Sequence, residues 1–156
     1  MRYLSMLEIA YSKSENRNDW EGTYASVHLT RTSKARLYNY FRNYIPRLKD
    51  QDSFHITTTY TKRILDIKPK IVAVNLYSKH FKYEKFGDTT LVLRVHHPVL
   101  ERLFLESRKA GATWDFPSYK AHITLSTEFP SDIANLPPLP DFNLYTTKHI
   151  VEGLQE

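Results

Sequence analysis

The stretches "FHITTTY", residues 54–60, and "AHITLST", residues 121–127, both contain the tripeptide His-Ile-Thr. Both are rich in β-branched residues, which predicts a β-strand at each place. In a strand, the side chains at positions i and i+2 point to the same face of the sheet. The imidazole and the first threonine hydroxyl of each stretch should therefore project together.

A third His-x-Thr occurs at His28, so the short motif alone is a weak signal. A longer pattern separates the three. A strand, a helix, a His-Ile-Thr strand and a further strand are predicted in residues 22–80, and the same order recurs in 89–149. The shift that superimposes the two His-Ile-Thr motifs also carries the helix predicted at 33–45 onto residues that overlap the helix predicted at 98–111. His28 falls outside this repeat and is predicted to be an ordinary strand histidine.

Local patterns predict the other elements. Strand-forming residues indicate strands at 22–30, 71–79 and 142–154. Thr32 or Ser33 is the expected N-cap of the first helix. The whole chain, 1–156, is expected to form a single α+β domain with two lobes.

Composition restricts the class of protein. The net charge is +5 with a pI near 9.3, which favours an anionic partner. The absence of cysteine excludes disulfides, thiolate metal sites and cysteine nucleophiles. No apolar run reaches the length of a membrane span. The apolar stretch near the start is not typical of a signal peptide, because it is short and interrupted by Glu8. We therefore expect a cytoplasmic protein that does not bind a membrane.

Two histidines and two threonines form the candidate catalytic group. If the lobes pack around one cleft, His55 and Thr57 converge there with His122 and Thr124. One neutral imidazole can accept a proton from an attacking hydroxyl, and the other, protonated, can protonate a leaving oxygen. The threonine hydroxyls can donate hydrogen bonds to phosphate oxygens. This group suits the cleavage of a phosphodiester without a metal.

No metal or other cofactor is expected. A zinc site needs closely spaced ligands, and the adjacent pair His96 and His97 stands alone in the sequence. We expect this pair to cap the following helix.

The duplicated His-x-Thr strands resemble those of the two-histidine phosphoesterase superfamily. A "GTYASV" strand before the first helix, a last strand ending "HIVEGL", the size and the basic charge are most similar to the phage anti-CBASS nucleases. That family destroys the cyclic di- and trinucleotides that trigger bacterial antiphage defence. The resemblance implies two pseudo-symmetric lobes of antiparallel sheet with outer helices and a central cleft. It also implies metal-independent cleavage of 3'–5' linkages, with attack by the neighbouring 2'-hydroxyl and no protein partner.

The resemblance adds candidate substrate-binding residues. A tyrosine on the early strand and a glutamate near the C-terminus serve the site in that family, and the matching positions are Tyr24 and Glu152. The family can also stack a base on an aromatic residue close to the C-terminus, but "GLQE" has none. By their position before the second motif, Trp114 and Tyr119 are the candidates instead. For Trp114, core packing is an equal alternative.

Two other functions are consistent with the sequence. The first is an RNA-processing enzyme that opens 2',3'-cyclic phosphate ends. The second is a non-catalytic nucleotide-binding protein or a structural protein of a phage. A histidine-triad hydrolase is disfavoured, because the His-x-His-x-His pattern is absent.

Overall fold

Two antiparallel sheets carry the two His-Ile-Thr motifs. The computed structural model describes residues 2–3 and 17–155, so the apolar stretch that Glu8 interrupts lies outside the described residues. The first sheet has the strand order β1-β9-β2-β3, with β4 and β5 paired to β9. Its strands are β1 (Arg2–Tyr3), β2 (Thr23–Leu29), β3 (His55–Thr61), β4 (Lys70–Ile71), β5 (Asn75–Leu76) and β9 (Leu144–Gln155).

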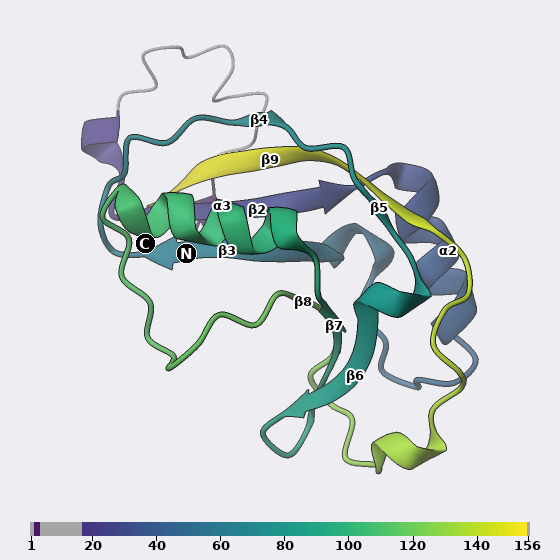
Figure 1. Cartoon of the computed structure of the whole chain (residues 1–156). Helices are drawn as coiled ribbons and strands as arrows, with labels where there is room; N and C mark the ends of the chain where they lie inside the picture. The colour runs from purple at the N-terminus through teal and green to yellow at the C-terminus, as the bar shows by residue number, and fades with distance from the viewer. Residues whose placement is uncertain (1, 4–16, 156) are drawn as a thin grey trace.

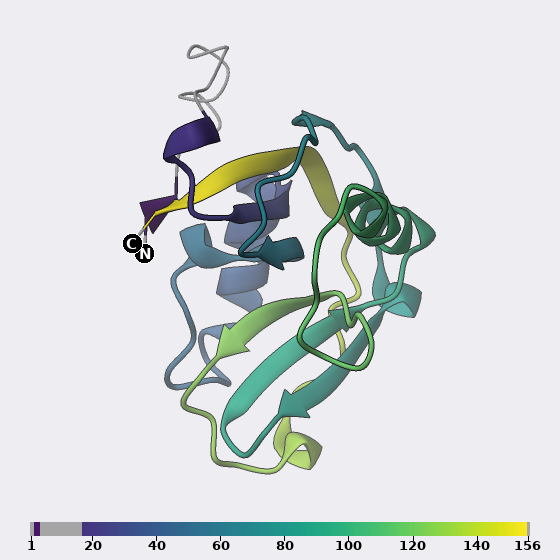
Figure 2. The ribbon, with the colours of Figure 1, turned by 90° about the vertical axis from the view of Figure 1, so that its left-hand side faces the viewer.

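The second sheet is a three-stranded meander with the order β6-β7-β8. Its strands are β6 (Phe81–Phe86), β7 (Thr90–Val95) and β8 (His122–Ser126). It lies below the first sheet in Figure 1, and Figure 2 shows the same two layers from the side. The antiparallel α+β architecture predicted from the sequence is confirmed.

The two long helices follow the strands that precede each motif. The first, α2 (Arg31–Phe41), begins after Thr30, whose hydroxyl accepts a hydrogen bond from the backbone N–H of Ser33. The predicted N-cap at Thr32 or Ser33 is therefore wrong. Thr30 is the threonine of the third His-x-Thr, and its hydroxyl is used to start a helix.

The second helix, α3 (Pro98–Lys109), begins at the predicted proline, and Gly111 follows its end with φ +111°. His97 is its N-cap, because the imidazole accepts a hydrogen bond from the backbone N–H of Val99. The predicted capping role of the adjacent histidine pair is confirmed for His97.

The strand predicted at 71–79 is absent and is replaced by the short strands β4 and β5. Between them the chain still bonds to the β9 backbone, from Val72 N–H to the Thr147 carbonyl and from Thr146 N–H to the Val74 carbonyl, and the Thr146 hydroxyl satisfies the other two backbone groups. It accepts from the backbone N–H of Val74 at 2.9 Å and donates to the carbonyl of Val72 at 2.6 Å. A side chain thus satisfies backbone groups that strand pairing would otherwise satisfy.

One hydrophobic core joins both sheets and both helices. The motif strands alternate as predicted: Ile56 and Ile123 are fully buried, whereas the histidines and first threonines are partly exposed. The main core residues are Val27, Leu29, Leu37, Phe41, Ile56, Leu91, Leu93, Leu100, Ile123, Leu125 and Leu144. The catalytic candidates therefore stand on the open faces of strands whose other faces are buried.

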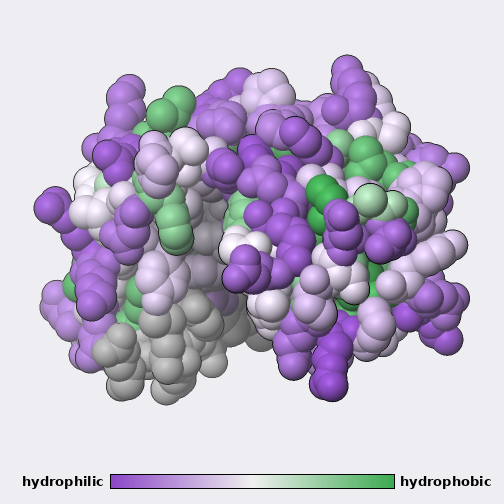
Figure 3. Space-filling view, turned by 90° about the horizontal axis from the view of Figure 1, so that it is seen from below, coloured by the Kyte–Doolittle hydropathy of each residue, from purple (hydrophilic) through white to green (hydrophobic). Residues whose placement is uncertain are grey.

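Seen from below, the surface is mainly hydrophilic, with small hydrophobic patches between polar side chains (Figure 3). In the part of the chain that is described, neither α2 nor α3 has the length and apolar character that crossing a bilayer requires.

Candidate active site

Each motif histidine is oriented by a hydrogen bond from its ring to the backbone carbonyl two residues earlier. His55 Nδ1 lies 2.6 Å from the carbonyl oxygen of Ser53, and His122 Nδ1 lies 2.8 Å from that of Lys120. A carbonyl only accepts hydrogen bonds, so in each imidazole Nδ1 carries the proton and donates it. Each Nε2 is thereby left with its lone pair, ready to accept a proton from a substrate group.

The two motifs meet at one cavity. The strands β3 and β8 contact each other across the two sheets, and a cavity of about 550 Å³ is lined by both Thr57 and His122. The charge of His122 affects the pKa of His55, as expected for histidines that face a common space. Thr124 shares the face of His122 because it lies two residues further along β8.

Tyr24 connects the first motif histidine and threonine. Its hydroxyl lies 2.5 Å from His55 Nε2 and 2.8 Å from Thr57 Oγ1. Since Nδ1 of His55 carries the proton, Nε2 accepts and the Tyr24 hydroxyl donates to it. The Tyr24 oxygen can then accept from Thr57, which gives a directed chain of hydrogen bonds from Thr57 to Tyr24 to His55.

The other predicted substrate residues surround this centre. Glu152 on β9 lies directly opposite Tyr24 on β2, and cross-strand partners share a face of the sheet. Trp114 and Tyr119 both line the cavity. Tyr119 is largely occupied with packing: its ring stacks on Phe104 at 4.4 Å and its hydroxyl donates to the backbone carbonyl of Thr57 at 2.7 Å.

Burial sets the protonation of both motif histidines. It is the largest influence on the pKa of His55 and lowers it; the hydrogen bond to Ser53 raises it in part, and His122 lowers it. Burial also lowers the pKa of His122 most strongly, opposed by the Lys120 carbonyl. Both imidazoles are therefore mainly neutral near pH 7 in the free protein.

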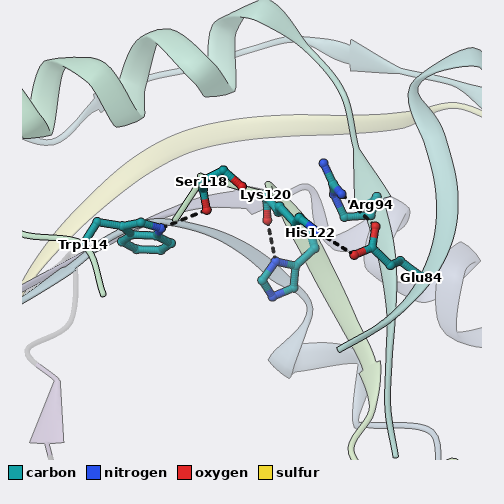
Figure 4. A network of polar contacts seen from close by, with 6 residues as sticks. All are labelled: Glu84, Arg94, Trp114, Ser118, Lys120 and His122. Carbon is teal, nitrogen blue, oxygen red and sulfur yellow. Dashed lines mark hydrogen bonds and ion pairs between the residues drawn. The ribbon is translucent and has the colours of Figure 1, made fainter. Parts of the chain in front are cut away.

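A charged network beside His122 was not predicted from the sequence. Arg94 on β7 lies opposite His122 on β8. Glu84 on β6 binds Arg94 Nη1 at 2.8 Å and Lys120 Nζ at 3.0 Å, and Figure 4 shows this group beside the His122 ring. Arg94 lowers the pKa of His122 and Glu84 raises it. The signal available in the sequence was the charged residues Lys82, Glu84 and Lys85 along β6 and the single Arg94 in the otherwise uncharged β7, a pattern equally typical of a solvated hairpin.

His28 also lies nearer to the site than an ordinary strand histidine would. It pairs with His55 across β2 and β3, and the two rings stack with centroids 6.3 Å apart. Burial and the nearby cationic groups lower the pKa of His28 to about 4, so its ring is neutral. Its Nε2 is 3.1 Å from the Ser26 hydroxyl.

Metal chemistry has no visible ligand set. Among residues 2–3 and 17–155, no group of three or more His, Cys, Asp or Glu side chains could hold a metal ion. The polar groups in the cavity lining are the His122 imidazole, the Lys120 ammonium, the Asp115 carboxylate and several hydroxyls; the imidazole can exchange protons, and the cation and hydroxyls can bind phosphate oxygens.

Solved structures share this fold. Escherichia coli LigT complexed with NADP+ superimposes with a TM-score of 0.62 and 15% identity, covering 85% of this chain and 86% of LigT. LigT complexed with 3'-AMP gives a TM-score of 0.59 and 11% identity over 85% and 87% of the two chains. A crystal structure described as a phosphoesterase gives 0.61 and 14% over the same shares.

Sequence relatives are more specific. A protein of Vibrio phage KVP40 named anti-CBASS protein Acb1 is 30% identical over 112 residues, which span 68% of this chain and 72% of the phage protein. The sequence model of the anti-CBASS protein Acb1 family matches residues 21–156, which include every candidate site residue named above. The chain therefore belongs to the anti-CBASS protein Acb1 family.

Proposed function

We propose that this protein is a metal-independent phosphodiesterase that cleaves the 3'–5' linkages of cyclic di- and trinucleotides and so counters CBASS immunity. Membership of the anti-CBASS protein Acb1 family supports the biological role. The observation that carries the chemistry is the matched pair of histidines, each with Nδ1–H bound to the carbonyl two residues earlier.

His55 is proposed as the base of the first step. The Tyr24 hydroxyl already donates to His55 Nε2 at 2.5 Å, so this lone pair is oriented to receive an O–H group. The 2'-hydroxyl of a bound ribonucleotide takes the place of Tyr24 and gives its proton to Nε2 while its oxygen attacks phosphorus. Because the nucleophile belongs to the substrate, its proximity contributes several kcal/mol to the rate enhancement.

His122 is proposed as the acid that protonates the leaving 5'-oxygen. In the free protein its pKa is lowered, but Glu84 counteracts the charge of Arg94 beside it. A bound phosphodiester adds a negative charge next to the ring, which favours the protonated form. The products are a 2',3'-cyclic phosphate and a 5'-hydroxyl, and water then opens the cyclic phosphate with the two roles reversed.

Thr57 and Thr124 are proposed to hold the phosphate. Each lies two residues after a motif histidine and on its face, so their hydroxyls can donate to the nonbridging oxygens as negative charge develops there. When Tyr24 is displaced from His55 it becomes available as a further donor. Glu152, opposite Tyr24, is proposed to accept hydrogen bonds from the ribose or the base.

The test uses a 3',3'-cyclic dinucleotide with EDTA present. We expect opening of the ring and an early product with a 2',3'-cyclic phosphate, detected by mass spectrometry. An analogue with 2'-deoxyribose at both linkages should bind without being cleaved. Loss of activity in EDTA with recovery on adding a divalent ion would refute the metal-independent mechanism, and normal cleavage of the deoxy analogue would show that water is the nucleophile.

The cyclic oligonucleotide is the only partner that this proposal requires. Because CBASS acts inside the bacterium, the proposed place of action is the host cytoplasm. Preferred cleavage of linear RNA ends with 2',3'-cyclic phosphate would instead favour a role in RNA processing.

A further inference from the structure

The cavity beside His122 has aromatic walls. Besides Thr57 and His122 it is lined by side chains from β3, β6 and the loop between α3 and β8. The rings on its walls are those of Tyr60, Phe86, Trp114, Phe116 and Tyr119. A cavity of about 550 Å³ with mostly apolar walls and few polar groups has the size and character of a small-molecule site.

The loop that forms one wall is folded upon itself. Trp114 Nε1–H donates to the carbonyl of Ser118 at 3.2 Å, as Figure 4 shows. The Trp114 ring packs edge-on against Phe104 of α3 and against Tyr119. Tyr119 is tied to β3 through its hydrogen bond to Thr57. The wall is therefore formed before a ligand arrives, which reduces the entropic cost of binding.

Two rings at this cavity remain exposed. Phe116 is 66% exposed and Tyr60 is 39% exposed, although water is a poor environment for an apolar ring. Phe116 contacts Trp114 with centroids 5.6 Å apart. Exposed aromatic rings grouped around a cavity that Lys120 and His122 also line, together with the acidic Asp115, fit a flat aromatic ligand whose anionic group lies toward Lys120 and His122. A nucleobase on its phosphate has this chemistry.

We propose that this pocket binds the base of the nucleoside on the leaving side of the scissile phosphate, with Phe116 as the stacking ring. The inference rests on the proposed function. We assign the leaving side because His122, the proposed acid for the leaving 5'-oxygen, lines the pocket. His55 is not among the described lining residues. Phe86 supports the same wall, with its ring edge-on to His122 at 4.7 Å.

A single substrate can test this side preference. In a 3',3'-cyclic dinucleotide with one adenine and one abasic ribose, the enzyme chooses between two linkages. Cleavage with adenosine as the leaving nucleoside gives a 5'-hydroxyl on adenosine, and cleavage at the other linkage gives it on the abasic ribose. Mass spectrometry with fragmentation measures the ratio of the two products. Because Phe116 is mostly exposed, Phe116→Ala should fold normally.

We expect Phe116→Ala to shift this ratio about 5- to 150-fold away from the product with 5'-adenosine, the effect of losing one base–aromatic stack. Phe116→Tyr keeps a ring and should keep the wild-type ratio. Leu105→Ala is the matched control, since Leu105 is 58% exposed on α3 outside the cavity. An unchanged ratio in Phe116→Ala, or a shift in the opposite direction, would overturn the inference. Failure of the wild-type protein to open the cyclic dinucleotide with both adenines would instead overturn the proposed function.

Discussion

The different tasks proposed for the two histidines can be separated by changing the leaving group. A substrate whose bridging 5'-oxygen is replaced by sulfur expels a much weaker base, so it needs no acid. On the normal oxygen substrate, His55→Ala and His122→Ala should each reduce turnover by about 10²- to 10⁴-fold, the usual contribution of a general acid or base. On the sulfur substrate, His122→Ala should return to within about tenfold of the wild-type rate. His55→Ala should remain as slow as before, because proton removal from the 2'-hydroxyl is still required.

The structure also predicts how much stability each substitution removes. His55→Ala deletes two hydrogen bonds, with Ser53 and with Tyr24, whereas His122→Ala deletes one, with the Lys120 carbonyl. At about 0.5–1.5 kcal/mol for each bond, the losses are about 1–3 and 0.5–1.5 kcal/mol. Both are smaller than a typical free energy of unfolding of about 5–15 kcal/mol, so both variants should remain folded.

The assay measures single-turnover cleavage, with formation of the thiol or hydroxyl product quantified by mass spectrometry. Urea unfolding of each variant measures its stability. His28→Ala is the control. Its ring stacks on His55 but takes no proton in the proposed reaction, so its loss should change turnover by less than about tenfold. Recovery of His55→Ala on the sulfur substrate, with His122→Ala still slow, would mean that the two roles are reversed. Recovery of neither would show that His122 does not protonate the leaving group.

Three further predictions concern pH and charge. The pH dependence of kcat/KM reports the pKa values of the acid and the base in the free enzyme. Because burial lowers the pKa of both His55 and His122 below 6.5, the acid loses its proton and kcat/KM should fall as pH rises above 6.5. A pH–rate profile that is flat to pH 8 would contradict this. Glu84→Gln leaves the charge of Arg94 uncompensated, so the pKa of His122 should fall further. The pH optimum of kcat/KM should then move to lower pH. An unmoved or higher optimum would show that Glu84 does not raise the pKa of His122. The pKa of His149 is lowered from 6.5 to about 4 by burial, so the unfolded chain binds more protons and stability falls as pH decreases between these values. In urea unfolding, the loss of stability between pH 7 and pH 5 should be about 2 kcal/mol smaller in His149→Asn than in the wild type, and the loss that remains includes that of His28, whose pKa is also lowered to about 4.

Local periodicity along the strands predicted the part of the candidate site that lies within each motif. Alternation along a strand places the histidine and threonine of each motif on one face, and the burial of Ile56 and Ile123 confirms that alternation. Tyr24 was identified only through the family resemblance. Its hydrogen bonds with His55 and Thr57 depend on the register of β2 against β3, which no local pattern specifies.

The errors in the predicted fold arose where several residues were equally suitable. Thr30, Thr32 and Ser33 can all cap a helix, and the structure uses Thr30. The run 71–79 has the composition of a strand, but the Thr146 hydroxyl satisfies its backbone at the middle. Strand propensity measures fit to a sheet surface and cannot detect such a distant side chain.

The aromatic pocket could not be found from the sequence, because its rings come from separate elements. Phe86 is on β6, Tyr60 is on β3, and Phe116 is in the loop before β8. Closeness in sequence to the second motif indicated Trp114 as a candidate, and the structure places its loop at the pocket.

We propose that the repeat predicted across 22–80 and 89–149 is the origin of the paired site. Its support is the topology, since in each half the strand before the helix pairs antiparallel with the motif strand, β2 with β3 and β7 with β8. The proposal predicts that the two halves superimpose strand for strand around the motifs.

The position of β9 has a consequence for how the protein is made. This strand lies inside the first sheet, between β1 and β2, where Thr23 pairs with Gly153. During synthesis, β2 and β3 leave the ribosome long before their sheet can be completed, because domains fold as units once their strands are present. Until β9 emerges, one edge of β2 is open to pairing with other chains. The sheet that carries His55 is therefore the last part expected to form, and pairing between residues so distant in sequence favours slow folding.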